Sequence, residues 1–170
     1  MSSKLQYTGD ISYVGGRTRW GTGQAKFTKV ELLDSNSKQQ DKFAIGDKIN
    51  IRLEYLANEK IDNPTFEISI FNIDETLLFC SHYNISRAGQ YSIIGRGILE
   101  CDLDTIAMVP GNYYVTVDIM VEIGDLSYDR IGRAAVFSII EGEGQCLNNK
   151  YQGFSDQGVI NMPHEWRRKE

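Results

Sequence analysis

The chain is poor in the side chains that usually carry catalysis. It contains only two histidines, His82 and His164, so a Ser-His-Asp arrangement would depend on one of them. It has no Gly-x-Ser-x-Gly motif, and the turn at Gly21-Thr22-Gly23 lacks the Gly-Lys-Ser/Thr that completes a phosphate-binding loop. A catalytic pair of carboxylates for glycoside hydrolysis is not excluded, because the distance between two carboxylates in space is not readable from the sequence. No particular pair stands out. We therefore expect a non-catalytic domain.

Cysteine is scarce as well. Cys80, Cys101 and Cys146 are odd in number and form no Cys-x-x-Cys pair, which favours free thiols in a reducing cytoplasm. Cys80 and His82 would share one face of a strand, but two ligands do not make a zinc site. The sequence predicts neither a metal nor any other cofactor.

Long apolar runs and basic clusters are missing. No run approaches the roughly 18 apolar residues that span a bilayer, and the start of the chain lacks the apolar core of a secretory signal. Lys and Arg number 18 against 23 Asp and Glu, and the one basic run, Arg167-Arg168-Lys169, is typical of a solvated tail. Nucleic acid is therefore not an expected partner.

What the chain does have is alternation of apolar and polar residues. The segments Ile49 to Tyr55 and Tyr113 to Val121 alternate with a period of two, the mark of a half-buried strand. Turn residues separate these segments from further strand-like runs, and no segment shows a helical period. The additional runs are 27–32, 66–71, 77–84, 91–103 and 128–140. This pattern predicts an all-β sandwich or barrel.

Composition divides the chain into four parts. We expect an extended N-terminal segment at 1–24, a β-sandwich at 25–140, a Gly- and Glu-rich linker at 141–150, and a C-terminal docking segment at 151–170. The last segment holds apolar and aromatic anchors, such as Trp166, that suit docking on another surface.

The segment at 113–122 also predicts a binding face. If Tyr113, Val115, Val117 and Ile119 point into the core, the residues between them point outward. Aromatic rings beside carboxylates, amides and guanidinium groups are the mixture that binds sugars. The candidate glycan-binding residues are Tyr114, Thr116, Asp118, Met120, Phe71, Glu67, Ser69, His82, Asn84, Tyr128, Arg130 and Arg133. Alternatively, a neighbouring strand, the N-terminal segment or a dimer partner covers these residues.

The order of several motifs resembles a known family. Arg19-Trp20-Gly21-Thr22-Gly23-Gln24 opens the series, with Gln24 where an acid is expected, and the segment from Gly158 to Trp166 closes it. Between them lie Phe43-x-x-Gly46-Asp47, Asn63-Pro64-x-Phe66 and Pro110-Gly111-x-Tyr113. This series resembles the C-terminal domain of Wzt-type ATP-binding subunits of O-antigen polysaccharide ABC transporters.

The resemblance implies an immunoglobulin-like antiparallel β-sandwich without catalytic activity. It implies binding of a bacterial O-antigen, the lipopolysaccharide O-chain, so that recognition of the finished glycan is coupled to export. The implied partners are the O-polysaccharide, a second copy that exchanges C-terminal segments in a homodimer, and the nucleotide-binding and transmembrane parts of the transporter. The implied location is cytoplasmic, peripheral to the inner membrane. A ligand-free structural or dimerisation sandwich and a carbohydrate-active enzyme are the alternatives.

Overall fold

The computed structural model describes residues 18–85, 89, 92–105, 108–121 and 126–141. In these residues the chain forms strands that follow the predicted runs closely. They are β1 (Thr18–Trp20), β2 (Ala25–Leu33), β3 (Lys42–Ala44), β4 (Lys48–Asp62), β5 (Thr65–Asn72), β6 (Leu77–Asn84), β7 (Ser92–Asp104), β8 (Gly111–Met120) and β9 (Ser127–Ile140). The described part contains no helix long and apolar enough to span a membrane.

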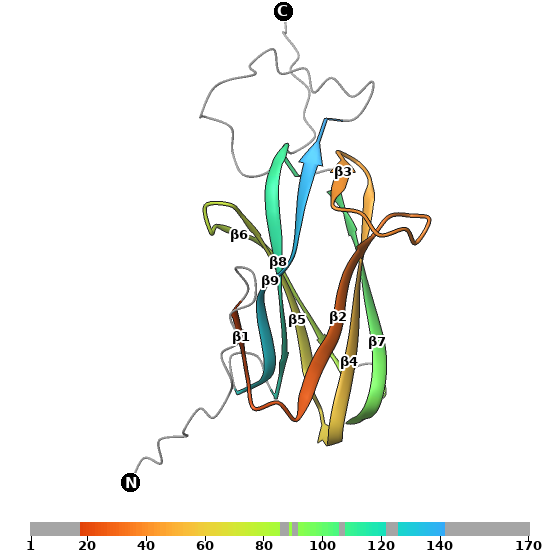
Figure 1. Cartoon of the computed structure of the whole chain (residues 1–170), viewed down its shortest axis with the longest axis vertical. Helices are drawn as coiled ribbons and strands as arrows, with labels where there is room; N and C mark the ends of the chain where they lie inside the picture. Colours follow the sequence, from red (N-terminus) through yellow and green to blue (C-terminus); the bar gives the residue numbers. More distant parts are fainter. Residues whose placement is uncertain (1–17, 86–88, 90–91, 106–107, 122–125, 142–170) are drawn as a thin grey trace, which may run out of the picture.

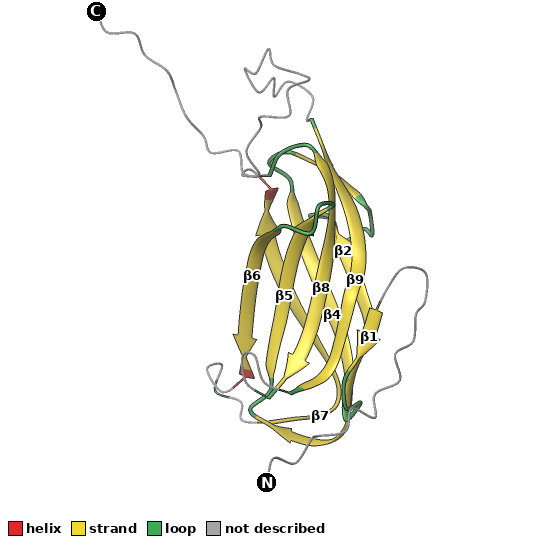
Figure 2. Ribbon diagram, turned by 90° about the vertical axis from the view of Figure 1, so that its left-hand side faces the viewer, coloured by secondary structure: helices red, strands yellow, loops and turns green. Residues whose placement is uncertain are grey.

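The strands form two sheets that pack face to face (Figure 1, Figure 2). The larger sheet has the order β1-β9-β8-β5-β6, with β3 also paired to β9, and the smaller sheet has the order β2-β4-β7. Every pairing is antiparallel except that of β3 with β9. The predicted immunoglobulin-like antiparallel β-sandwich is confirmed.

The core lies between the sheets and is filled by alternate residues of both. On β8, Val115, Val117 and Ile119 are fully buried, as the alternation predicted, and Ile51 of β4 is fully buried opposite them in the smaller sheet. Burial of such aliphatic side chains contributes roughly 1.5 to 3 kcal/mol each. The alternating segments therefore determine which face of each sheet is hidden.

The two shortest strands, β1 and β3, were not predicted. Each has three residues, too few to show a period of two. β1 lies in the segment expected to be merely extended, and it pairs with β9 from Thr18 opposite Gly132 to Trp20 opposite Arg130. Most of the predicted linker and the whole docking segment fall at 142–170, outside the described residues.

One buried carboxylate ties the two sheets together. Asp129 of β9 is 3% exposed and accepts hydrogen bonds from Arg19 Nε and Nη2 of β1, both at 2.8 Å. It also accepts the backbone N–H of Phe27 on β2 at 2.7 Å, and Arg19 Nη2 donates to the Phe27 carbonyl oxygen at 2.8 Å. Asp129 thus fixes the crossing from the larger sheet to the smaller one.

The turn after Trp20 needs glycine at its first position. Gly21 has a φ of 149°, and a Cβ there would lie 2.3 Å from the carbonyl oxygen of Tyr128. The following amides of Thr22 and Gly23 donate to the carbonyl oxygens of Ser127 and Tyr128. The motif Arg19 to Gly23 is therefore the clamp that holds the start of β9.

We predict that Asp129→Ala destabilises the domain by about 2 to 4 kcal/mol, because it leaves the Phe27 N–H and the Arg19 guanidinium without their acceptor. Urea denaturation measures the change in the free energy of unfolding. Lys60→Ala, which breaks an exposed ion pair to Asp62, is the matched control and should cost less than about 1 kcal/mol. Equal costs for the two variants would contradict the role given to Asp129.

Candidate functional site

Most of the predicted glycan-binding residues lie on the outer face of the larger sheet. The β5–β8 register places Glu67 opposite Asp118, Ser69 opposite Thr116, and Phe71 opposite Tyr114. On the flanking strands, His82 lies opposite Glu67 and Arg130 opposite Asp118. Side chains of one face meet across strands in this way because directly opposite residues point to the same side. The structure thus brings together residues that are far apart in sequence.

A hollow of about 530 Å³ lies on this face where β1, β9, β8 and β5 run side by side. Three aromatic rings and two guanidinium groups dominate its lining. The lining residues are Thr18, Trp20, Phe71, Glu75, Tyr114, Thr116, Arg130, Gly132 and Arg133. Five of the predicted residues, Phe71, Tyr114, Thr116, Arg130 and Arg133, are therefore part of one site.

The rings in the hollow are held by stacking and by cations. Phe71 and Tyr114 stack with centroids 5.2 Å apart and planes 9° from parallel. The Arg133 guanidinium lies 4.7 Å from the centre of the Tyr114 ring, and that of Arg130 lies 5.4 Å from the centre of the Trp20 ring. Each such cation–ring contact contributes about 0.5 to 1 kcal/mol where it is exposed to solvent. The rings are therefore held in fixed positions by their neighbours.

Backbone irregularities place the two charged groups at the rim. The pairing of β8 with β9 shifts register between Val115 and Val117, and within the bulged stretch of β9 Arg133 has a φ of 54°. Glu75, in the turn between β5 and β6, has a φ of 63°, and its carboxylate accepts from Arg133 Nη2 at 3.3 Å. Positive φ at residues other than glycine costs energy and concentrates at functional sites.

The expectation that Thr116, Asp118 and Met120 are exposed was wrong. They lie on the predicted face but are 5%, 1% and 3% exposed, and Ser69 beside them is 3% exposed. Neighbouring strands cover Asp118, whose Oδ2 accepts from Ser127 Oγ at 2.9 Å and from Arg130 Nη1 at 3.3 Å. Alternation gives the side of a sheet, and the cross-strand neighbours decide how much of that side solvent reaches.

Burial raises the pKa of Asp118 to about 6 from its ordinary value of 3.8, while hydrogen bonding from Ser127 and the charge of Arg130 oppose the rise. At 1% exposure the carboxyl group lies below the surface of the face. Its raised pKa follows from desolvation and gives no support to a role as a catalytic acid.

The remaining predicted residues do not line the hollow. Tyr128 packs against the hydrophobic core, not on the outer face, because it sits where the β8–β9 register shifts. Glu67, His82 and Asn84 lie toward β6, where Glu67 Oε2 is 3.0 Å from His82 Nε2 and Asn84 Nδ2 donates to Thr65 Oγ1 at 2.8 Å. Their role in glycan binding stays a prediction.

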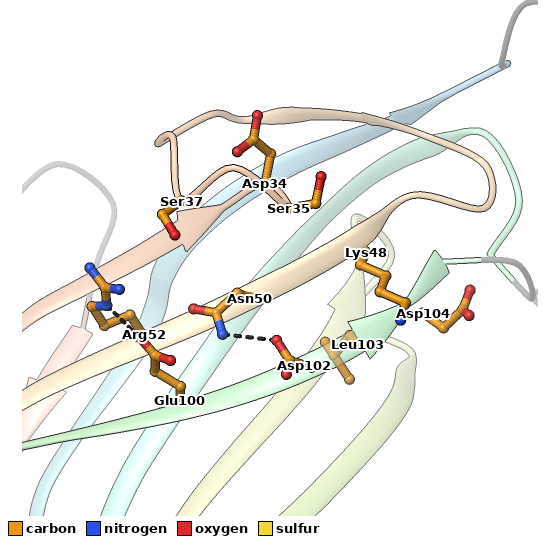
Figure 3. A pocket seen from close by; sticks show the side chains of 10 residues that line it. All are labelled: Asp34, Ser35, Ser37, Lys48, Asn50, Arg52, Glu100, Asp102, Leu103 and Asp104. Atoms are coloured by element: carbon orange, nitrogen blue, oxygen red, sulfur yellow. Dashed lines mark hydrogen bonds and ion pairs between the residues drawn. The ribbon is translucent and has the colours of Figure 1, made fainter.

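The smaller sheet carries a second hollow of about 540 Å³ on its own outer face (Figure 3). Ten residues line it: Asp34, Ser35, Ser37, Lys48, Asn50, Arg52, Glu100, Asp102, Leu103 and Asp104. None is aromatic, and four of its side chains bond in pairs, Asn50 with Asp102 at 2.9 Å and Arg52 with Glu100 at 2.7 Å. The two volumes are nearly equal and do not distinguish the hollows. The aromatic rings and guanidinium groups that line the hollow on the larger sheet make that hollow the candidate binding site.

Sequence reasoning missed Trp20 and Glu75 as members of the site. Trp20 was noticed only as part of a motif, because the three-residue strand that places it beside Arg130 was not predicted. Glu75 lies in a turn, which shows no alternation, and it lines the hollow beside Arg133. The Arg19-Trp20 dipeptide before a glycine turn was the available signal for Trp20.

The architecture and the hollow define the chain as an immunoglobulin-like β-sandwich domain with an aromatic and arginine-lined outer face. A family profile described as the Wzt C-terminal domain matches residues 16–160. The chain belongs to this family of Wzt C-terminal domains.

One solved structure shares the fold of this chain over nearly its whole length. The crystal structure of the C-terminal domain of wzt superposes with a TM-score of 0.73 at 15% identity, covering 92% of this chain and 91% of that one. A β-glucuronidase from Parabacteroides merdae matches with a TM-score of 0.43 at 14% identity, covering 68% of this chain and 13% of the enzyme. An immunoglobulin-like protein from Pseudomonas aeruginosa matches with a TM-score of 0.40 at 11% identity, covering 70% and 98%. No curated protein matches the chain.

We predict that Asp118 makes the folded domain less stable as the pH rises from about 4 to about 6. The folded state holds the Asp118 proton over this range while the unfolded state has released it, so ionisation costs the folded state roughly 3 kcal/mol. Asp118→Asn removes this dependence. The difference in the free energy of unfolding between parent and variant, measured by urea denaturation at several pH values, should change over this interval and level off above it. A difference that is independent of pH would contradict the raised pKa.

Proposed function

We propose that this domain binds a bacterial O-antigen polysaccharide without chemical conversion, through the hollow on the outer face of the larger sheet. Binding of the finished glycan is then coupled to its export by an ABC transporter. The domain acts at the cytoplasmic side of the inner membrane, as part of or beside the ATP-binding subunit, and as a homodimer.

Membership of the Wzt C-terminal domain family supports the transporter context. The observation that carries the proposal for the site is the set of three positioned rings, Trp20, Phe71 and Tyr114, with Arg130 and Arg133 beside them. Sugars present apolar C–H faces that pack on aromatic rings, and their hydroxyl groups accept hydrogen bonds from guanidinium donors.

The shape of the site sets the expected strength of binding. An open hollow on a sheet gives few enclosed contacts, and association costs consume much of their energy, so each site binds in the micromolar to millimolar range. Two sites in a homodimer raise the apparent affinity for a long glycan through avidity. Weak single sites suit a carrier that must release the polymer.

We predict that Trp20→Ala and Tyr114→Ala each weaken binding of the cognate O-polysaccharide at least about tenfold, equivalent to about 1.4 kcal/mol, because each removes a ring face from the hollow. Titration of the isotope-labelled domain, followed by NMR, gives the affinity and locates the shifted signals. The polysaccharide comes from the source organism, and an unrelated polysaccharide serves as the negative control.

Tyr83→Ala is the matched control, because Tyr83 is 46% exposed on the same sheet but does not line the hollow. It should bind like the parent domain. If Trp20→Ala and Tyr114→Ala both bind with the affinity of the parent domain, the glycan does not bind in the hollow. If the cognate glycan causes no saturable shifts in the parent domain, the alternative of a ligand-free structural or dimerisation sandwich is favoured. The anomeric NMR signals of the glycan, followed in the same samples, test whether the domain is a carbohydrate-active enzyme. Loss of these signals over time would indicate hydrolysis and overturn a purely binding role.

A further inference from the structure

The β5–β6 edge of the larger sheet gathers three different metal-binding side chains outside the hollow. Cys80 and His82 are two residues apart on β6 and therefore point to the same side. The antiparallel register sets Glu67 of β5 directly opposite His82. The sulfur, the imidazole nitrogen and a carboxylate oxygen all lie within 4.8 Å of one another. Sequence spacing places Cys80 and His82 together, and the strand pairing adds Glu67.

We propose that Glu67, Cys80 and His82 bind a divalent transition-metal ion, with Zn²⁺ the best match. Thiolate sulfur, imidazole nitrogen and carboxylate oxygen are the donors that Zn²⁺ takes in proteins. Ca²⁺ and Mg²⁺ prefer all-oxygen surroundings and do not suit a site with a sulfur ligand. The donor set therefore selects the class of ion.

The distances fit a tetrahedral ion after small side-chain movements. Zn²⁺ bonds of about 2.3 Å to sulfur and about 2.0 to 2.2 Å to nitrogen and oxygen place neighbouring donors roughly 3.3 to 3.6 Å apart. In the structure, Glu67 Oε2 lies 3.0 Å and Cys80 Sγ lies 3.9 Å from His82 Nε2. These two separations bracket the required values, and flexible χ angles of the ligands can supply the difference.

His82 lies between the other two members of the cluster. His82 Nε2 faces both Glu67 and Cys80, yet a neutral imidazole nitrogen carries either one proton or one lone pair. It therefore bonds one neighbour well and leaves the other with a weak contact. A cation at the centre meets all three donors at once, and the thiol proton of Cys80 passes to solvent when the ion binds.

An outer partner already orients the carboxylate. Ser69 Oγ donates to Glu67 Oε1 at 2.8 Å, which leaves Oε2 directed at His82. Such outer hydrogen bonds hold metal ligands in place and are typical of built sites. The Glu67 side chain is 12% exposed and that of His82 is 27% exposed, so the carboxylate is anchored while the imidazole is reached by solvent.

The position on the sheet determines what the ion does there. Within the described residues, β6 pairs only with β5 and is therefore an edge strand of the larger sheet. Three protein ligands leave the fourth position of Zn²⁺ to water or to an oxygen of a bound molecule. The ion links the edge strand to the interior of the sheet and offers an open coordination position on the same face as the hollow.

The test is direct binding of Zn²⁺ to the reduced, chelator-treated domain without a polyhistidine tag, measured by competition with a chromophoric chelator of micromolar affinity. We expect one ion per chain. Ser69→Ala removes only the outer partner of Glu67 and should lower the affinity for Zn²⁺ by roughly 10- to 100-fold. Cys80→Ser and His82→Ala each remove a direct ligand and should lower that affinity further. Co²⁺ binding should give a thiolate absorption band that Cys80→Ser removes.

Cys101→Ser and Cys146→Ser are the matched controls, since Cys101 lies on β7 and Cys146 lies outside the described residues. Both should bind Zn²⁺ like the parent. NMR spectra of each variant show whether it is folded. Absence of binding in the competition assay, unchanged affinity in Cys80→Ser, or loss of binding in Cys101→Ser would each overturn the proposal. None of these outcomes bears on the hollow, which Glu67, Cys80 and His82 do not line and whose variants lie at Trp20 and Tyr114.

Discussion

The buried Asp129 carboxylate is the interaction on which the arrangement of the site depends. β1 has three residues and cannot hold its place by backbone pairing alone, so the ion pair to Arg19 and the bond from the Phe27 amide fix it against β9 and β2. Trp20 follows Arg19 directly and reaches Arg130 only when β1 is in register. The same contact therefore joins the sheets and sets one wall of the hollow.

The floor of the site is built from residues that do not reach the solvent. Asp118 lies beneath the face and accepts from Arg130, which in turn lies over Trp20. Burying a carboxylate is costly, and its raised pKa records that cost. The positive φ values of Glu75 and Arg133 add strain at the rim. Two of the four described non-glycine residues with positive φ, and the buried Asp118, thus lie around the same hollow, while Ser37 and Asn63 lie elsewhere.

Much of the fold could be predicted from the sequence because a long strand with one buried face shows its period directly. Tyr113 to Ile119 gave both the strand and its inward residues. The same alternation could not show that Asp118 and Met120 are covered, since cover comes from neighbouring strands. Trp20 and Glu75 were missed because short strands and turns carry no period. The third member of the Cys80–His82 cluster was invisible because the β5–β6 register, not sequence spacing, brings Glu67 to it.

The parallel pairing of β3 with the end of β9 has a mechanical consequence. After β2 the chain leaves the smaller sheet, lays Lys42–Ala44 along Ser138–Ile140, and returns to the smaller sheet as β4. The last residues of β9 are therefore bonded on both sides, to β3 and to Gly111–Tyr113 of β8. A pull on the chain beyond Ile140 along the strand axis loads both rows of hydrogen bonds in shear, so that they share the force and do not open one at a time. Both rows belong to the larger sheet, so tension applied at the end of β9 is shared between β3 and β8 within that sheet.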